Sequence, residues 1–349
     1  MMRAALCAVA LLLAVPARAE PPSVPALPPL PAQFDALGPA ITALPGKAGR
    51  VVQYADTGEI GWRAVLYIGG TGTSARAMLM TGYLETLRRR LHIRLISVER
   101  NGFGDSVFDP AWTLADYADD VRGVVDHLGL ARFAVVAISG GGPYAAHVAA
   151  AMPERIVSLH FAAALADAPN AAPCAMDADT LTRQLAPVVG NPQSWWAFPA
   201  SSPTHRIPGF ADRAYDEGAR AFFIRGQMGD ARPEAAEMLR YCHARLADLP
   251  LARVTAPVFT YYGLADPLVA PANGAFWRDR LGGPVTARVY PGEGHDVQYR
   301  HWDQVLIDLS GLAGTGAQAR TLVCVRGKER LVPAARVPRG ATTGLCLWR

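Results

Sequence analysis

Three residues of the 349-residue chain are of the types that together perform nucleophilic acyl transfer: Ser139, Asp266 and His295. A serine hydroxyl is a poor nucleophile at neutral pH, so a histidine must accept its proton. A carboxylate must in turn hold that histidine in the correct tautomer and stabilise the imidazolium that forms. We therefore assign Ser139 as candidate nucleophile, His295 as candidate base and Asp266 as candidate orienting acid.

The segment around Ser139 predicts a sharp turn between a strand and a helix. Residues 133–138 read Phe-Ala-Val-Val-Ala-Ile, an apolar stretch typical of a buried strand, and Ser139 is followed by three glycines. Small residues at Ala137 and Gly141 allow the strand and helix to approach closely, so that a serine in a strained conformation stands above the sheet. The N–H of Gly140 would then face a developing oxyanion. An ordinary glycine-rich strand-to-helix turn is the alternative interpretation.

Asp266 and His295 also follow apolar stretches that predict strands. Residues 257–263 lead into a loop that ends at Asp266, and residues 287–290 lead into a Gly/Pro-rich loop that ends at His295. Asp296 could compete for the acid role, but adjacent side chains rarely face each other, so we prefer Asp266. The other histidines are expected to be structural: His92, His127, His147, His160, His205, His243 and His301.

With these motifs in the order Ser, Asp, His, the chain resembles an α/β-hydrolase of the esterase, lipase and haloperoxidase-like group over roughly residues 50–312. The loop from Glu99 to Ser106 is similar to the Asp-Arg-Pro-Gly-x-Gly-x-Ser loop of that family, with Glu99 and Asn101 replacing Asp and Pro. Residues 113–130 have the capping residue, periodicity and final glycine of the helix that precedes the nucleophile strand. The resemblance implies an α/β fold: a doubly wound, mostly parallel central sheet with helices on both faces and an inserted, mainly helical cap.

The chain departs from the family pattern at two positions. Ala137 stands where Gly is usual, and Gly69 stands where relatives commonly have the His of a His-Gly pair. Because backbone amides are the donors of such an oxyanion hole, Gly70 or Thr71 can still supply the second N–H beside that of Gly140. A loop that reads Gly69-Gly70-Thr71-Gly72 is expected to hold its donors loosely.

Composition predicts a packed domain with additions at both ends. Apolar residues make up 51% of the chain and charged residues 18%, which excludes a disordered body. We expect the following organisation: a signal peptide at 1–19, a Pro-rich linker at 20–49, the hydrolase domain at 50–313 with its cap at about 165–253, and a basic tail at 314–349.

The first 19 residues indicate export to a periplasm or to the outside. They combine Arg3, an apolar run over 4–15 and the ending Ala17-Arg18-Ala19. An uncleaved anchor is the alternative, but the apolar run is shorter than the roughly 20 residues that span a bilayer. No transmembrane span is therefore expected in the mature chain.

Four cysteines remain beyond the signal segment, and an oxidising compartment could pair them in three ways. Cys174 with Cys242 in the cap, and Cys324 with Cys346 in the tail, is the least demanding arrangement. Four reduced thiols are the alternative. The spacing of these cysteines fits no zinc pattern.

The cap region is rich in aromatic residues that could wall an apolar acyl or aryl pocket. The residues assigned to substrate binding are Trp195, Trp196, Phe198 and Phe222. Each of them could instead pack the cap on the domain below.

The basic pI belongs to the tail, where six arginines and one lysine face a single glutamate after residue 313. Such a segment could contact an anionic surface, although a solvated extension is the simpler interpretation. No motif suggests nucleic-acid binding.

The residues together predict an exported serine hydrolase that cleaves a small-molecule carboxylic ester and needs no metal or organic cofactor. Alternatives are hydrolysis of amide, lactone or carbon–carbon bonds, cofactor-free perhydrolysis, and noncatalytic ligand binding on the same fold. The oligomeric state is left open.

Overall fold

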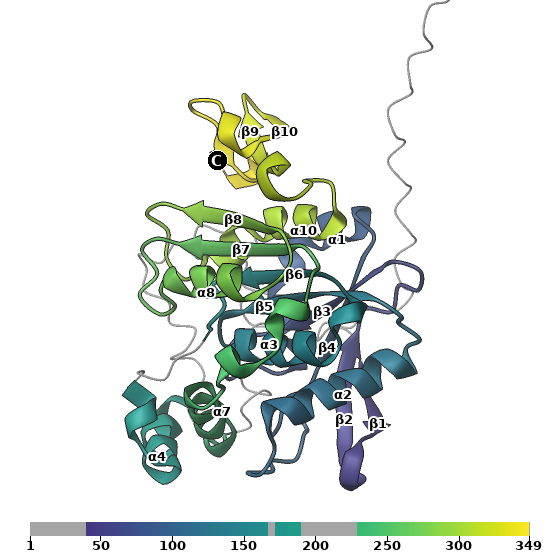
Figure 1. The fold of residues 1–349 in the computed structure, drawn as a ribbon, viewed down its shortest axis with the longest axis vertical. Helices are drawn as coiled ribbons and strands as arrows, with labels where there is room; N and C mark the ends of the chain where they lie inside the picture. The colour runs from purple at the N-terminus through teal and green to yellow at the C-terminus, as the bar shows by residue number, and fades with distance from the viewer. Residues whose placement is uncertain (1–39, 167–171, 190–228, 349) are drawn as a thin grey trace, which may run out of the picture.

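A computed structural model describes residues 40–166, 172–189 and 229–348 of the chain (Figure 1). Its centre is an eight-stranded sheet in the order β1-β2-β4-β3-β5-β6-β7-β8. The strands are β1 (Ile41–Pro45), β2 (Val51–Asp56), β3 (Arg63–Ile68), β4 (Ile93–Val98), β5 (Phe133–Ile138), β6 (Ile156–Ala162), β7 (Val258–Gly263) and β8 (Val285–Tyr290). The six strands from β4 to β8 in this order each pair in parallel with their neighbour. In contrast, β1 pairs antiparallel with β2, and β2 pairs antiparallel with β4. This is the mostly parallel sheet predicted from the sequence.

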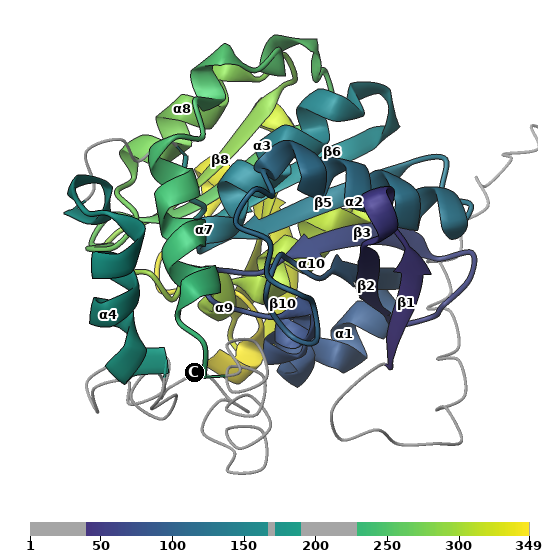
Figure 2. The ribbon, with the colours of Figure 1, turned by 90° about the horizontal axis from the view of Figure 1, so that it is seen from below.

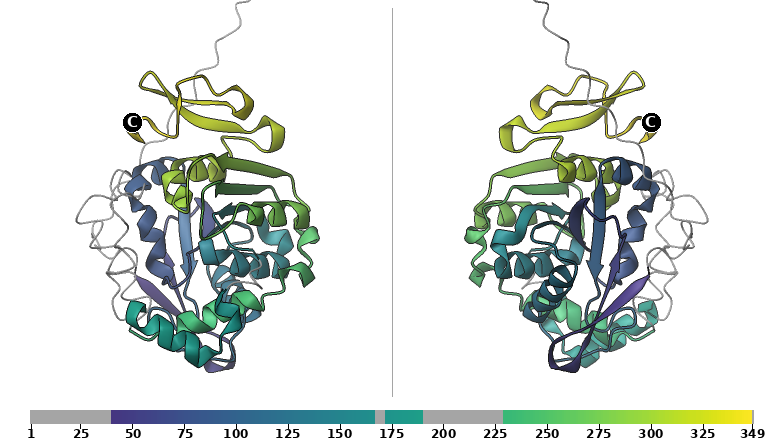
Figure 3. Two further views of the ribbon diagram at one scale, coloured as in Figure 1. Left: turned by 90° about the vertical axis from the view of Figure 1, so that its left-hand side faces the viewer. Right: turned by 90° about the vertical axis from the view of Figure 1, so that its right-hand side faces the viewer.

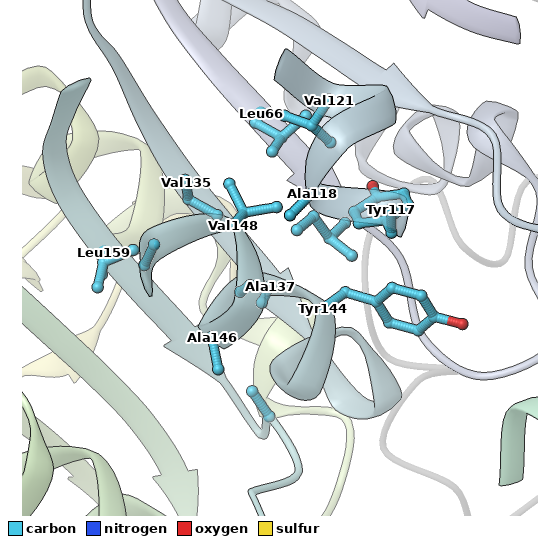
Figure 4. Packing of buried hydrophobic residues seen from close by; sticks show 14 of the residues in the cluster. Leu66, Tyr117, Ala118, Val121, Val135, Ala137, Tyr144, Ala146, Val148 and Leu159 are labelled. Atoms are coloured by element: carbon cyan, nitrogen blue, oxygen red, sulfur yellow. The ribbon is translucent and has the colours of Figure 1, made fainter. Parts of the chain in front are cut away.

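Alternate residues of the central strands enter two separate hydrophobic layers, because successive side chains of a strand point to opposite faces. In β5, Phe133, Val135 and Ala137 join one layer, while Ala134, Val136 and Ile138 join the other. Figure 4 shows the first layer, where Val135 and Ala137 lie near Ala146 and Val148 of the following helix. Burial on both faces explains why β5 is apolar at every position.

Helices cover both faces of the sheet (Figure 3). The α-helices are α1 (Glu85–Arg90), α2 (Leu114–His127), α3 (Gly142–Ala151), α4 (Ala178–Val189), α7 (Arg232–Cys242), α8 (Ala272–Arg280), α9 (Val297–Arg300) and α10 (Trp302–Ser310). A 3-10 segment, Ala75–Leu84, precedes α1. Helices α2, α3 and α8 contribute to the layer that contains Val135, and the 3-10 segment, α9 and α10 to the layer that contains Val136.

Helix α2 begins where its sequence predicts. The Thr113 hydroxyl accepts from the N–H of Asp116, and the Asp116 carboxylate accepts from the N–H of Thr113, which completes a capping box. This helix packs against α3 and so supports the segment that follows the Ser139 turn.

Two helices of the predicted cap region, α4 and α7, lie side by side at one end of the molecule (Figures 1 and 2). A disulfide between Cys174 and Cys242 links the 3-10 turn before α4 to the last residue of α7. This pairing is the one that the sequence favours. Trp195, Trp196, Phe198 and Phe222, the predicted substrate-binding residues, lie outside the described residues.

The C-terminal segment, predicted as a basic tail, forms a second sheet at the end of the molecule opposite α4 and α7 (Figure 3). Its strands are β9 (Arg320–Val325), β10 (Lys328–Pro333) and β11 (Thr342–Thr343), which pair antiparallel in the order β10-β9-β11. The second predicted disulfide, Cys324–Cys346, closes this sheet. The idea of a solvated extension is therefore wrong for these residues, because a cystine and the contacts of Leu322 with Ile307 and Ala313 hold them in place.

The N-terminal boundary also differs from the expectation. Residues 41–45, which belong to the predicted linker at 20–49, form β1 because their backbone pairs with β2. The predicted signal peptide at 1–19 and the proline cluster lie outside the described residues. Within the part of the chain that is described, no helix has the length and apolar character needed to cross a membrane.

Candidate active site

Ser139 occupies a strained turn at the carboxyl end of β5. Its φ of +50° lies in the left-handed region, which a residue with a side chain adopts at a cost. The serine opens a 3-10 turn, Ser139–Gly141, that leads directly into α3. The structure thus has the predicted strand, turn and helix around this residue.

The glycines after Ser139 are required by close backbone packing. A β-carbon on Gly141 would lie 2.6 Å from the carbonyl oxygen of Ile68, and one on Gly142 would lie 1.9 Å from that of Leu165. The N–H of Leu165 also donates to the Ser139 carbonyl at 2.7 Å. These contacts hold the turn against the ends of the neighbouring strands β3 and β6.

The structure brings the three predicted residues into one hydrogen-bonded chain. His295 Nε2 lies 3.0 Å from Ser139 Oγ, and His295 Nδ1 lies 2.8 Å from Asp266 Oδ2. Asp266 Oδ1 accepts from the N–H groups of Leu268 and Val269 at 2.8 and 2.9 Å. Both oxygens of the carboxylate are therefore occupied, and the imidazole is oriented toward the serine.

The loops that carry Asp266 and His295 are joined through their backbones. A β-carbon on Gly263, the last residue of β7, would lie 2.2 Å from the Glu293 carbonyl oxygen, so only glycine allows this crossing. The N–H of Ala265 donates to the same carbonyl at 2.9 Å. This close approach places residues 29 positions apart in the sequence within hydrogen-bond distance.

The environment of Asp266 favours its ionised form. Burial alone would raise the pKa of this carboxyl, but the hydrogen bond to His295 and the two backbone N–H groups outweigh it, so that the pKa lies below its usual value. Asp296, the alternative acid, stands at the start of α9, and His295 directs Nδ1 to Asp266 instead.

The loop after β3 lies beside Ser139 and the helix that follows it. A β-carbon on Gly70 would be 3.2 Å from Ser139 Cβ, and the Thr71 nitrogen lies 3.0 Å from the corresponding point on Gly140. Within the described ranges, the N–H groups of Gly70, Thr71 and Gly140 donate to no acceptor. Three uncommitted backbone donors therefore lie next to Ser139 or to the residue that follows it.

A buried ion pair holds this loop, contrary to the expectation that four residues rich in glycine would hold their donors loosely. Arg100 Nη2 donates to the carbonyls of Gly70 and Thr73 at 2.7 and 2.5 Å. Arg100 Nη1 donates to Glu237 Oε1 at 2.6 Å, and Glu237 Oε2 accepts from the N–H of Gly72 at 2.9 Å. The charged pair thus secures the loop on both sides of Thr71.

Glu99, the family-loop residue that replaces Asp, is also buried and supports the same region. Its carboxylate accepts from the N–H of Ala75 at 3.0 Å and from the N–H of Arg100 at 3.2 Å. Burial raises its pKa to about 7, despite these hydrogen bonds. A β-carbon on Gly104 would lie 2.3 Å from Glu99 Oε2, so the loop closes tightly over the acid.

A comparison with protein families agrees with this architecture: the model of the alpha/beta hydrolase family matches residues 65–309. The chain belongs to the α/β hydrolase family. No curated protein matches the chain significantly.

Solved α/β hydrolases share its fold. An esterase from Thermogutta terrifontis is 18% identical, with a TM-score of 0.58 over 78% of this chain and 97% of its own. An esterase from Rhodococcus sp. is 18% identical, with a TM-score of 0.57 over 78% and 99%. A hydrolase from Pseudomonas aeruginosa is 18% identical, with a TM-score of 0.53 over 78% and 98%.

Two other histidines of this α/β hydrolase, His160 and His301, have structural partners. His160 is buried between Ser158 and Tyr261, and burial lowers its pKa to about 3. His301 contacts the Glu293 carboxylate at 2.9 Å and stacks on Tyr290. Neither histidine takes part in the hydrogen-bonded series Asp266–His295–Ser139. Among the described residues, no group of three or more His, Cys, Asp or Glu side chains is arranged to hold a metal ion.

Two residues at the site have no signal in the sequence motifs. Glu237 and Tyr241 both come from α7, and both reach the loop after β3. Arg100 belongs to the loop that resembles the family motif, but its ion-pair partner Glu237 lies far from that loop in the sequence. The general rule that a buried charge needs a counter-charge is the one signal that could have indicated an acidic partner for Arg100.

Proposed function

We propose that this α/β hydrolase is an exported serine esterase that cleaves a carboxylic ester through Ser139, His295 and Asp266. The hydrogen-bonded chain from Asp266 through His295 to Ser139 Oγ is the observation that supports this proposal most directly. It has the geometry that lets an imidazole take the serine proton while a carboxylate stabilises the resulting imidazolium.

In the proposed reaction, Ser139 Oγ attacks the ester carbonyl carbon as its proton passes to His295 Nε2. The tetrahedral intermediate carries its negative charge on the former carbonyl oxygen. His295 then gives the proton to the departing alcohol, which leaves Ser139 acylated. A water molecule deprotonated by His295 attacks the acyl-enzyme and releases the acid.

The N–H of Gly140 and that of Thr71 are the proposed donors to the oxyanion. Thr71 is favoured over Gly70 because the Thr71 nitrogen lies close to Gly140, 3.0 Å from the position that a β-carbon on Gly140 would take. Donors that are already fixed in position stabilise developing charge without reorganisation, and the Arg100–Glu237 pair supplies that fixation.

Two further parts of the proposal concern substrate and location. An apolar acyl or aryl group is proposed because the cap region contains Trp195, Trp196, Phe198 and Phe222. Export is supported by the two disulfides, since such bonds persist in oxidising compartments.

The test is hydrolysis of p-nitrophenyl esters from acetate to palmitate by the mature protein and by Ser139→Ala. Ser106→Ala is the matched control, because Ser106 lies in the loop after β4 and lines a separate surface groove with Arg50 and Gln53. We expect Ser139→Ala to lose essentially all turnover and Ser106→Ala to retain it. The preferred chain length would define the acyl group.

Labelling with a fluorophosphonate distinguishes the alternatives. Labelling of Ser139 without turnover of any ester would show an activated serine that acts on another bond. A folded protein that neither reacts with the probe nor hydrolyses ester would contradict the proposed chemistry and favour ligand binding.

A further inference from the structure

The side-chain hydroxyls of Thr71 and Tyr241 lie beside Gly140, the residue that follows the nucleophile. A β-carbon on Gly140 would lie 2.2 Å from Thr71 Oγ1 and 2.5 Å from Tyr241 Oη. Any larger residue after the nucleophile would displace them. The chain therefore uses glycine at this position, and the vacated space is filled by polar oxygen atoms rather than by an apolar side chain.

The same point is surrounded by amide donors. The Thr71 nitrogen lies 3.0 Å from the β-carbon position of Gly140. The second amide is that of Gly140 itself, the residue directly after Ser139. Tyr241 Oη therefore stands beside the two amides that are proposed to bind the oxyanion.

The hydroxyl hydrogen of Tyr241 is available for donation. Thr71 Oγ1 donates to Tyr241 Oη at 3.4 Å, so the tyrosine oxygen serves as acceptor in that contact. No residue in the described part of the chain accepts a hydrogen bond from Tyr241. Since a buried hydroxyl normally finds an acceptor, this donor is suited to a substrate oxygen.

Tyr241 is held firmly by its surroundings. Only 4% of the residue is exposed, and its ring meets that of Tyr144 edge to face. It lies one helical turn beyond Glu237 and next to Cys242, so α7 is anchored on both sides by the ion pair and the disulfide. Burial, reinforced by the nearby Glu237 charge, raises the pKa of Tyr241 well above its usual value, which keeps the hydroxyl protonated.

We propose that the Tyr241 hydroxyl is a third donor of the oxyanion hole, contributed by the cap-region helix α7 and oriented by the hydroxyl of Thr71. This inference rests on the proposed serine hydrolase chemistry. Tyr241 transfers no proton; it donates one hydrogen bond to the oxygen that becomes negative in the tetrahedral intermediate. The acylation step would thus depend on α7 as well as on the elements of the central sheet.

The test compares Tyr241→Phe with the wild type and with Tyr117→Phe. Tyr117 is the matched control because it is also buried and packs on the same Tyr144 ring, but its hydroxyl donates to the Val98 carbonyl at 3.4 Å instead of facing Thr71 and Gly140. We expect Tyr241→Phe to lower kcat for a p-nitrophenyl ester about 10²-fold with KM changed less than about threefold, since that is the usual effect of removing one oxyanion donor. Tyr117→Phe should retain the wild-type kcat.

A second readout does not depend on ester turnover. An aliphatic trifluoromethyl ketone adds reversibly to an activated serine and forms a tetrahedral oxyanion, which fluorine NMR detects directly. We expect its Kd to rise by about the same factor as kcat falls in Tyr241→Phe, whereas a merely structural role would leave it unchanged. The Thr71→Val variant should weaken the adduct too, and Thr71→Ser should restore it. Because the two hydroxyls act together, the double variant Thr71→Val/Tyr241→Phe should lose less than the product of the two single effects.

The outcomes separate this inference from the proposed esterase function. A wild type that binds the ketone but hydrolyses no ester would contradict the ester assignment and still test Tyr241 through the Kd. Retention of both kcat and Kd within about threefold in a folded Tyr241→Phe variant would overturn the inference. Absence of any adduct on the folded wild type would overturn both proposals.

Discussion

Arg100 and Glu237 form a buried ion pair, with Arg100 Nη1 2.6 Å from Glu237 Oε1, that joins the end of β4 to helix α7. The side chains are 4% and 0% exposed. Because both also bond to the backbone of residues 70–73, the pair connects the cap region to the loop that flanks the nucleophile. The two residues are 137 positions apart in the sequence, but the fold brings them into direct contact.

Removal of the Glu237 charge is therefore expected to reduce both stability and catalysis. Glu237→Gln leaves the Arg100 guanidinium buried without its counter-charge, which should cost about 3–5 kcal/mol of unfolding free energy. The loosened loop should lower kcat roughly 10- to 100-fold. Urea denaturation and ester kinetics measure the two effects.

The matched control for Glu237→Gln is Asp308→Asn. Asp308 pairs with Arg288 at 2.5 Å, and the two side chains are similarly buried. Arg288 also donates to Thr321 and to the Arg320 carbonyl, so this pair holds the C-terminal sheet rather than the triad. Asp308→Asn should lose stability while the folded fraction keeps its kcat. Equal loss of kcat in both variants would show that the Arg100–Glu237 pair has no specific link to the site.

Asp266→Asn should lower kcat about 10³- to 10⁴-fold, because an amide cannot both keep the His295 tautomer and stabilise the imidazolium. The asparagine carbonyl can still accept from Leu268 and Val269, so the fold should survive. Single-turnover acylation with a p-nitrophenyl ester measures the loss. Asp296→Asn should retain activity, and the reverse ranking of the two variants would exchange their roles.

Glu99 should make the protein less stable as the pH rises. Its pKa is about 7 in the folded state, against the ordinary value of 4.5. The folded state therefore holds the proton more tightly, and this stabilisation is fully present below pH 4.5 and is lost as the pH rises through 7. Conversion of this shift gives an upper bound on the order of 3 kcal/mol.

Urea denaturation of wild type and Glu99→Gln across that pH range tests the assignment. The glutamine cannot ionise, so the wild type should lose stability relative to the variant as the pH rises. A constant difference between the two proteins from pH 4 to pH 8 would mean that Glu99 does not titrate in this range.

Two glycine-to-alanine substitutions should change the stability of the protein in opposite directions. Gly123→Ala in α2 meets no atom within 4 Å of the new β-carbon and should stabilise the protein by about 1 kcal/mol, because alanine favours a helix. Gly142→Ala places its β-carbon 1.9 Å from the Leu165 carbonyl oxygen and should destabilise the protein or prevent folding. Thermal denaturation measures both, and stabilisation by Gly142→Ala would contradict the close packing at the elbow.

The two disulfides should differ in their effect on activity. Removal of either bond, as Cys174→Ser/Cys242→Ser or Cys324→Ser/Cys346→Ser, should cost about 2–4 kcal/mol of stability. Only the first bond fixes α7, which carries Glu237 and Tyr241, so only its loss should lower kcat in protein that remains folded. If the Cys324–Cys346 variant loses kcat to the same extent, the contact of α7 with the site does not explain the effect.

Much of the fold follows from local sequence patterns. The apolar run at 133–138 forms β5, and the capping pattern at Thr113 starts α2. Both signals are short-range, because hydrophobic periodicity and end-capping depend on residues a few positions apart. The segment after residue 313 shows the limit of composition: its positive charge suggested solvation, whereas pairing and a cystine fold it into a sheet.

The sequence by itself determined the identities of Ser139, Asp266 and His295 as candidates, since each follows an apolar strand in a recognisable order. It could not determine which residues would surround them. Glu237 and Tyr241 lie far along the chain in a helix without a motif, and their contacts with residues 70–73 exist only because the chain packs α7 beside the loop after β3. Local patterns encode strands, turns and caps, but the partner of a buried charge or hydroxyl is decided by tertiary packing, where burial makes an unpaired polar group costly.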